Sequence, residues 1–341
     1  MKVHTYAWLA WLISGLVVLT TTRNPLIILL VDLVLVVIQV WITPPSKKIL
    51  GITLRFGLSV LILSTVLNMF ISRFGETILF SLPAKIPLLG GNFTLEAFVY
   101  GLTNGLILIG IFTLFMILNQ VVSVHSLVRL IPQAFHPVAV VTTIALTFIP
   151  ASQKQFHAIR EAQAIRGQQL KKLRDWLPLV IPLLIGGLER AMQIAEAMTA
   201  RGFTAQSERK ISRLEKALLP LGLIFIILGW ILELSTQLPV SGGWLILTGL
   251  LCLLSLFFIS GKRVRKTTYA QEAWTKVSTW ITIFALVLSF SFILPFPGQQ
   301  ALLYEPYPLV KLPDFSILHG LLTLTSLAPI FFIGEVQHDQ D

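Results

Sequence analysis

The chain has 341 residues, of which 55% are hydrophobic and only 12% are charged, roughly half the charged fraction of a typical soluble domain. This composition excludes an ordinary soluble protein, and several apolar stretches of about eighteen residues or more predict an integral membrane protein. The net charge of +10 does not indicate a nucleic-acid partner, because the basic residues gather between the apolar stretches, as expected for a protein oriented in a lipid bilayer.

Apolar stretches along the chain predict an all-α fold, a polytopic membrane bundle with about eight spans. Pro25 begins the second span at a position where a missing N–H group does no harm. The first stretch lacks a small-residue cleavage site followed by a soluble domain, so we expect it to be a retained anchor. The predicted spans cover residues 6–22, 26–42, 52–71, 97–118, 217–234, 243–260, 276–294 and 316–333.

The distribution of lysine and arginine predicts the orientation of these spans in the plasma membrane. With the N-terminus inside, 22 of the 26 basic residues face the cytoplasm, and eight spans return the C-terminus to the same side. Two loops, residues 72–96 and 295–313, are then outside, and the five prolines of the second loop predict a compact cap. The four basic residues left outside are Arg23, Arg73, Lys85 and Lys311.

The chain divides into N-terminal spans (1–118), a central region (119–216) and C-terminal spans (217–341). The central region contains two apolar runs, 138–150 and 176–188, each too short to be a typical span. Each run continues into a charged helical segment. We therefore expect two long helices whose first halves touch the bilayer or the bundle and whose second halves are exposed to water.

One phrase, Glu-Ala-x-x-x-Arg-Gly, occurs twice in the central region, 35 positions apart. In each copy the arginine falls in the last helical turn and the glycine can adopt the left-handed conformation that terminates a helix. A single Arg-Gly pair is simply a good helix stop, but the recurrence of all four identities favours a functional role. The two copies consist of Glu161, Ala162, Arg166 and Gly167, and of Glu196, Ala197, Arg201 and Gly202.

We interpret the two helix ends as a docking site. A guanidinium group carries five donors in a rigid fork suited to carboxylates, and an exposed arginine can anchor an interface. Small residues on both helices are expected to let them cross closely as one stiff pair. These residues are Ala191, Ala195, Ala197 and Ala200 on the second helix, facing Ala158, Ala162 and Ala164 on the first.

The central region resembles the transmembrane T component of energy-coupling factor (ECF) transporters, the EcfT/CbiQ-like family. The resemblance is carried by four segments, residues 145–150, 161–167, 177–184 and 195–203. That family is marked by two Ala-Arg-Gly motifs at the ends of crossed coupling helices. Ala200-Arg201-Gly202 matches this motif fully, whereas the first copy begins with Ile165 instead of alanine.

The resemblance implies a scaffold that links two cytoplasmic ABC-type ATPases to a membrane-embedded substrate-binding S component. Arg166 and Arg201 would each enter a groove on one ATPase, and ATPase closure would move the crossed helices. The imported substrate would be a vitamin, its precursor or a transition-metal ion. The resemblance implies no cofactor of the chain's own.

Other functions receive less support from the residues. No phosphate-binding loop is present, so ATP hydrolysis is expected in another chain, and the six histidines show no metal-ligand spacing. We find no cluster of polar residues for an enzyme. Asp32 is an intramembrane charge and leaves open a secondary transporter with an ion relay. We favour instead a structural hydrogen bond, or a position close enough to the exterior for the carboxylate to stay hydrated.

Overall fold

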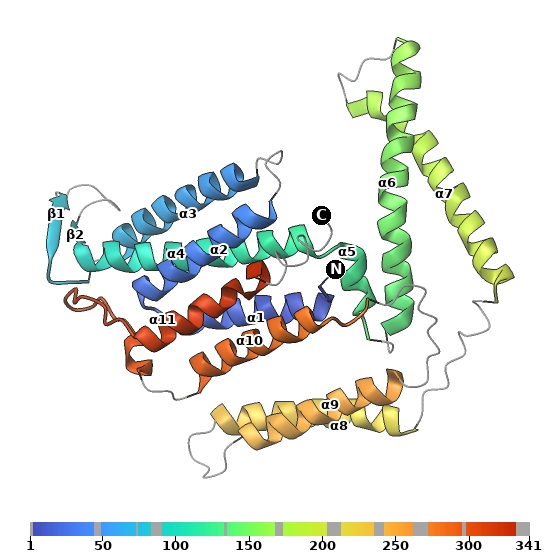
Figure 1. The fold of residues 1–341 in the computed structure, drawn as a ribbon. Coiled ribbons are helices and arrows are strands. Elements are labelled where there is room, and N and C mark those ends of the chain that lie inside the picture. Colours follow the sequence, from blue (N-terminus) through green and yellow to red (C-terminus); the bar gives the residue numbers. More distant parts are fainter. Residues whose placement is uncertain are drawn as a thin grey trace. The chain divides into compact units, whose positions relative to one another are not determined.

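A computed structural model of the chain forms two compact units, Met1–Ser123 with Ala270–Asp341, and Val124–Tyr269. The division into segments 1–118, 119–216 and 217–341 remains a prediction. Figure 1 shows the elements of both units, each of which is considered by itself. The structure describes residues 3–43, 49–72, 74–82, 91–132, 135–167, 173–202, 213–234, 242–261, 272–294 and 298–331.

The described residues of the first unit form a bundle of six α-helices with one short β-hairpin. Asn24 caps the second helix, because its side-chain oxygen accepts a hydrogen bond from the Leu26 amide at 3.0 Å, and Pro25 begins that helix as predicted. Thr94 caps the fourth helix in the same way. The helices are α1 (Thr5–Thr21), α2 (Pro25–Ile42), α3 (Ile49–Ile71), α4 (Leu95–Val121), α10 (Lys276–Ile293) and α11 (Ile317–Leu324).

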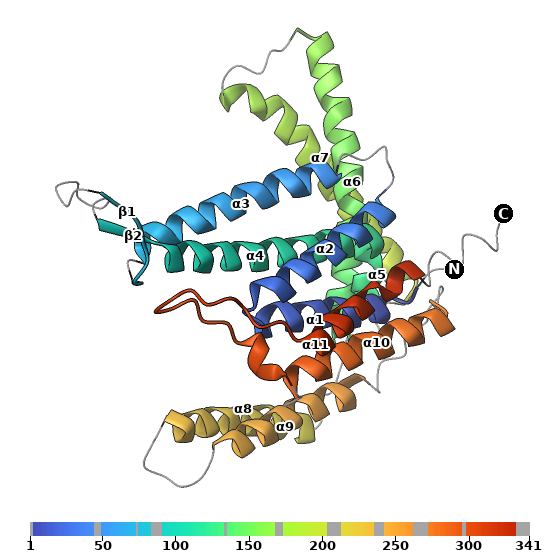
Figure 2. The same cartoon turned by 60° about the vertical axis from the view of Figure 1, so that its left-hand side comes forward.

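Helix α4 lies at the centre of this bundle and packs against α1, α2 and α3, while α10 packs on α1 and α11 on α2 (Figure 2). The core consists of fully buried side chains from several helices, among them Leu19, Ile28, Leu114 and Ile281. Segments from both ends of the sequence therefore form one hydrophobic core. Burial of this apolar surface is the main term that stabilises the unit.

The two loops predicted outside the membrane contact each other in this unit. Strands β1 (Ile78–Leu82) and β2 (Gly91–Thr94) form an antiparallel hairpin in the first loop. The Glu76 amide donates to the Pro308 carbonyl at 3.3 Å, and the hydroxyl groups of Ser72 and Tyr307 lie 2.6 Å apart. These contacts join the hairpin loop to the proline-rich loop, as a compact cap requires.

The second unit contains α5 (Val124–Arg129), α6 (His136–Ile165), the short 3₁₀ helix η2 (Leu173–Trp176), α7 (Leu177–Ala200), α8 (Arg213–Leu234) and α9 (Gly243–Gly261). Helix α6 packs with α7, and α8 packs with α9. At the α8–α9 contact, Gly222 lies opposite Gly249 and Gly229 opposite Gly242. The missing side chains let the two backbones approach closely, which is common between helices in membranes.

All eight predicted spans fall on helices within the described residues, which confirms the all-α membrane bundle; residues 332–333 of the last span lie outside the described residues. Within the part of the chain that is described, the helices long and apolar enough to cross a membrane are α2, α3, α4, α7 and α10. Helix α1 and the apolar segments in α8, α9 and residues 317–331 are shorter. Helix α7 was not among the predicted spans, because its apolar run alone is too short and only the whole 24-residue helix meets the length criterion.

Candidate functional site

The candidate docking site lies on the two long helices of the second unit, called here the α6–α7 pair. Both helices have a proline in the first turn, where its missing N–H group costs nothing. Each also contains an internal proline, Pro150 in α6 and Pro182 in α7, which removes one backbone hydrogen bond and favours a local bend. The predicted long helices are thus confirmed: their C-terminal ends fall within a residue of the expected positions, and α6 begins two residues earlier than expected.

The two Arg-Gly ends have the same backbone geometry. Arg166 and Arg201 are the C-cap residues of α6 and α7, and the following glycines have φ angles of 78° and 72°. The Gly167 amide donates to the Ala164 carbonyl at 3.0 Å, and the Gly202 amide donates to Thr199 at 2.9 Å. The left-handed glycine predicted at each helix end is therefore present.

Every residue predicted to form the docking site is exposed to solvent. Ile165, which precedes the first arginine, is 88% exposed and adds a large apolar side chain to that end. From the sequence, Ile165 was noted only as a departure from the family motif. The available signal was a large aliphatic residue directly before the Arg-Gly pair. The exposed predicted residues are Glu161, Ala162, Arg166, Gly167, Glu196, Ala197, Ala200, Arg201 and Gly202.

Helices α6 and α7 run antiparallel, so the two Arg-Gly ends lie at opposite ends of the pair. The Gln163 side chain donates to the Pro178 carbonyl at 3.4 Å, and the end of Gln155 lies against Gly186. The C-terminus of α6 is therefore beside the N-terminus of α7. Because α7 has 24 residues, its own C-terminus is roughly 36 Å farther along at 1.5 Å per residue.

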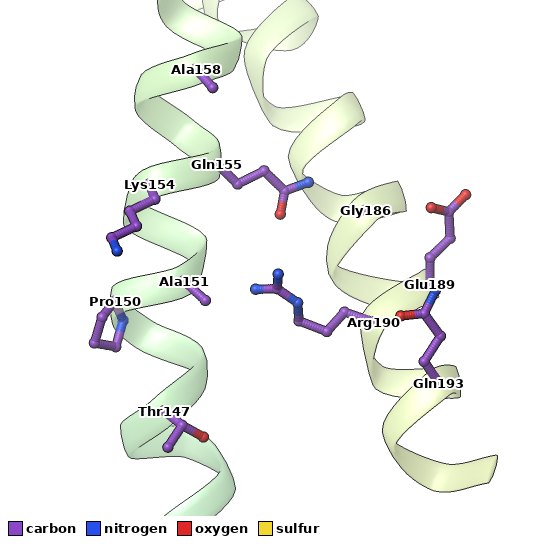
Figure 3. Close-up of a pocket in the computed structure, with 10 residues that line it drawn as sticks. All are labelled: Thr147, Pro150, Ala151, Lys154, Gln155, Ala158, Gly186, Glu189, Arg190 and Gln193. Carbon is purple, nitrogen blue, oxygen red and sulfur yellow. The ribbon is translucent and has the colours of Figure 1, made fainter. Parts of the chain in front are cut away.

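The antiparallel arrangement corrects the expected crossing through alanines. Ala191, Ala195, Ala197 and Ala200 do not meet Ala162 and Ala164, because the reversal of the chain places α7 residues 191–200 opposite the first half of α6. The observed close approach is between Gln155 and Gly186, with Phe148 near Gly187. Of the alanines predicted to lie at the crossing, Ala158 alone borders the space between the helices in this region (Figure 3).

Asp32 lies in the first unit, away from any described polar partner. Both of its carboxylate oxygens are buried without a hydrogen bond among the described residues, and Oδ1 faces Gly110 of α4. The structural hydrogen bond favoured from the sequence is therefore not found there. The described residues also contain no group of three or more histidine, cysteine or acidic side chains that could hold a metal ion.

The fold defines a polytopic α-helical membrane protein with two long antiparallel helices whose Arg-Gly ends are exposed. The model of the CbiQ family, described as cobalt transport protein, matches residues 3–212, and the chain belongs to this family. The match confirms the resemblance seen in the central region and extends it over α1–α4, where the sequence had offered only generic apolar helices. It ends immediately before α8.

Several curated relatives carry the name energy-coupling factor transporter transmembrane protein EcfT. The protein from Leuconostoc gelidum subsp. gasicomitatum is 34% identical over 99 residues, covering 27% of this chain and 37% of the relative. The Exiguobacterium sibiricum protein is 38% identical over 74 residues, covering 20% of this chain and 28% of the relative. A Listeria monocytogenes relative, named energy-coupling factor transporter transmembrane protein EcfT 1, is 29% identical over 163 residues, covering 42% of this chain and 58% of the relative. The matched regions thus span between 28% and 58% of the relatives' lengths.

Proposed function

We propose that this chain is the T component of an ECF-type importer and couples two cytoplasmic ABC-type ATPases to a membrane-embedded substrate-binding S component. The observation that carries the proposal is the pair of Arg-Gly helix ends, which share one geometry and lie at opposite ends of the α6–α7 pair. Two equivalent ends so far apart suit two separate copies of one kind of partner, because a single groove cannot contact both. The names of the relatives support the same role.

Each arginine is proposed to insert into an acidic groove on one ATPase. A guanidinium group at the carboxyl end of a helix forms bidentate contacts with carboxylates and opposes the negative end of the helix dipole. Glu161 and Ala162, and Glu196 and Ala197, lie on the preceding turn and complete each contact surface. When the ATPases close, the pair moves as a lever and tilts the S component in the bilayer.

The chain itself acts as a scaffold without catalytic chemistry, and ATP is hydrolysed by the partner subunits. The lysine and arginine distribution supports cytoplasmic N- and C-termini and a cytoplasmic α6–α7 pair. The imported cargo is a vitamin or a transition-metal ion, and the description of the CbiQ family supports the metal ion. The cargo pocket belongs to the S component.

Charge reversal at the two helix ends tests the docking. The double variant Arg166→Glu and Arg201→Glu is expected to lose ATPase subunits in co-purification, because two carboxylates then face acidic grooves. Arg160→Glu is the matched control, since Arg160 is an exposed α6 arginine away from the helix end and this variant should retain the ATPases. Retention of the ATPases at the wild-type level by the double variant would refute the proposal.

Asp32 supports one alternative, a secondary transporter with an intramembrane ion relay. The specific observation in its favour is the burial of both carboxylate oxygens without a described partner, which is costly and often marks function. A relay also needs a second ionisable group at the same depth. The substitution Asp32→Asn separates the two functions, because a relay fails without the carboxylate whereas the coupling scaffold does not use it.

A further inference from the structure

The β1–β2 hairpin of the first unit lies at the ends of two membrane-spanning helices (Figure 1 and Figure 2). Helix α3 ends at Ile71, shortly before β1 begins at Ile78, and Thr94 is both the last residue of β2 and the N-cap of α4. Both helices are long and apolar enough to cross a membrane. The hairpin is therefore held at the level where the bilayer meets water.

Three aromatic rings join the hairpin to α3. The Phe93 ring of β2 meets the Phe70 ring of α3 edge-on, with centroids 5.2 Å apart, and stacks on the Phe80 ring of β1 with centroids 4.5 Å apart. Phe93 is only 5% exposed, whereas Phe80 at the far end of the stack is 50% exposed. The stack thus begins on α3 and ends in an uncovered ring on β1.

Phe70 belongs to the face of α3 that is turned away from α4. Leu61, whose backbone approaches Gly105 of α4, precedes Phe70 by nine residues, or two and a half helical turns, and so lies on the opposite face. Leu63 and Leu67, seven and three residues before Phe70, share its face and are exposed. In a membrane-spanning helix such uncovered apolar side chains face lipid, and the aromatic stack continues this lipid-facing surface onto the hairpin.

The hairpin itself is poorly suited to either water or hydrocarbon. Neither strand contains a charged residue or a proline, and among the described residues each strand pairs only with the other. Soluble proteins protect open strand edges with charges or proline, and a two-stranded hairpin alone is marginally stable in water. The unpaired backbone groups of the edges are equally costly in hydrocarbon. The headgroup layer, which offers both apolar contact and hydrogen-bonding groups, meets both requirements.

We propose that the β1–β2 hairpin lies in the headgroup layer of the bilayer, with the Phe80 ring inserted toward the acyl chains beside the lipid-facing side of α3. Phe74, which is 79% exposed in the link between α3 and β1, adds a second apolar contact. Because neither strand is charged, insertion depends on burial of apolar surface and not on anionic lipid. The hairpin then fixes the depth of α3 and α4 in the bilayer, a role that is independent of ATPase docking.

Spin-label depth measurements on the full chain in phosphatidylcholine nanodiscs test the proposal. Cys252→Ser removes the single native thiol, and Phe80→Cys then carries a nitroxide label. Oxygen concentrates in lipid and a nickel chelate stays in water, so the ratio of their collision rates with the label reports its depth. The ratio at Phe80 should lie between those of two reference positions, Leu63→Cys on the lipid-facing side of α3 and Arg160→Cys on the polar half of α6.

A second labelled position keeps the proposal testable if Phe80→Cys folds poorly. Leu79→Cys changes a half-exposed β1 residue outside the aromatic stack, and its ratio should also exceed that of Arg160→Cys. Replacing phosphatidylcholine with phosphatidylglycerol should leave both ratios unchanged.

Ratios at the β1 positions equal to that of Arg160→Cys would place the hairpin in water and overturn the proposal, even if added subunits later covered it. A higher ratio in phosphatidylglycerol alone would show electrostatic attraction instead of apolar insertion, and would overturn it as well.

Discussion

The first unit and the α6–α7 pair bury their side chains to very different extents. In the bundle, α1, α2, α4 and α10 contribute most of the fully buried residues, whereas in the described part of the second unit the buried apolar side chains are only Ala139 and Leu179. Close packing fixes the positions of side chains in a core. The bundle therefore has a structure determined by its own core, while the pair leaves most of its residues exposed, as the proposed coupling role requires.

A substitution where the backbones of two bundle helices approach closely should have the largest effect on stability. A Cβ atom on Gly101 of α4 would lie 2.8 Å from the Thr65 Cα atom of α3 and 3.0 Å from the Ser64 carbonyl oxygen, and backbone atoms cannot move aside. Gly101→Val should lower the free energy of unfolding by about 3 kcal/mol. The thermal unfolding midpoint of the purified chain measures this loss.

The matched control is Gly51→Val on α3, because no atom lies within 4 Å of the Cβ position there. Its unfolding midpoint should stay close to that of the wild type. If the two variants had the same midpoint, the close α3–α4 contact would not be what stabilises the bundle.

Substitutions of the glycines at the two Arg-Gly ends should destabilise the helix ends through backbone strain and not through steric clashes. Gly167 and Gly202 have positive φ angles and open surroundings, so alanine costs about 1 kcal/mol in left-handed strain alone. Asparagine tolerates this conformation better and should cost less at both positions. Amide hydrogen exchange of the last α6 and α7 turns should rank wild type, asparagine and alanine in order of increasing exchange. The reverse order would exclude the left-handed helix end.

The substitution Gly186→Ala inside the α6–α7 pair should have a smaller effect than Gly101→Val in the bundle. The atom nearest to a Cβ on Gly186 is the end of the Gln155 side chain, which can rotate into the adjacent space between the helices. Gly186→Ala is therefore expected to change the free energy of unfolding by less than about 0.5 kcal/mol. The higher helix propensity of alanine offsets part of the cost of moving the Gln155 side chain. A loss as large as that of Gly101→Val would show that the pair is packed as rigidly as the bundle.

Asp32→Asn should have the smallest effect on transport. The substitution removes a carboxylate that has no described partner, so the unfolding midpoint of the chain should not fall. Uptake of the labelled vitamin or metal ion that the wild-type complex imports should persist. Abolished uptake in a normally assembled complex would instead support an ion relay through Asp32.

The sequence pattern was sufficient to predict where the helices lie in the chain, but not which residues of two helices contact each other. Apolar runs identified the spans, and the Arg-Gly spacing placed the ends of α6 and α7 within a residue, because these signals are local. The antiparallel contact of Gln163 with Pro178 depends on a chain reversal that alanine spacing does not encode. The same limit applies to Asp32: its carboxylate has no hydrogen-bond partner among the described residues because of which side of α2 faces Gly110.

The most direct test of the central claim is photo-crosslinking from the positions beside the two arginines. A photoreactive amino acid at Ile165, at Ala200, or at both is introduced into the complete complex. Each single position should crosslink to an ATPase subunit, and the doubly labelled chain should yield a product that contains two ATPase copies. Crosslinks to no ATPase, or to a single copy from the doubly labelled chain, would contradict the account.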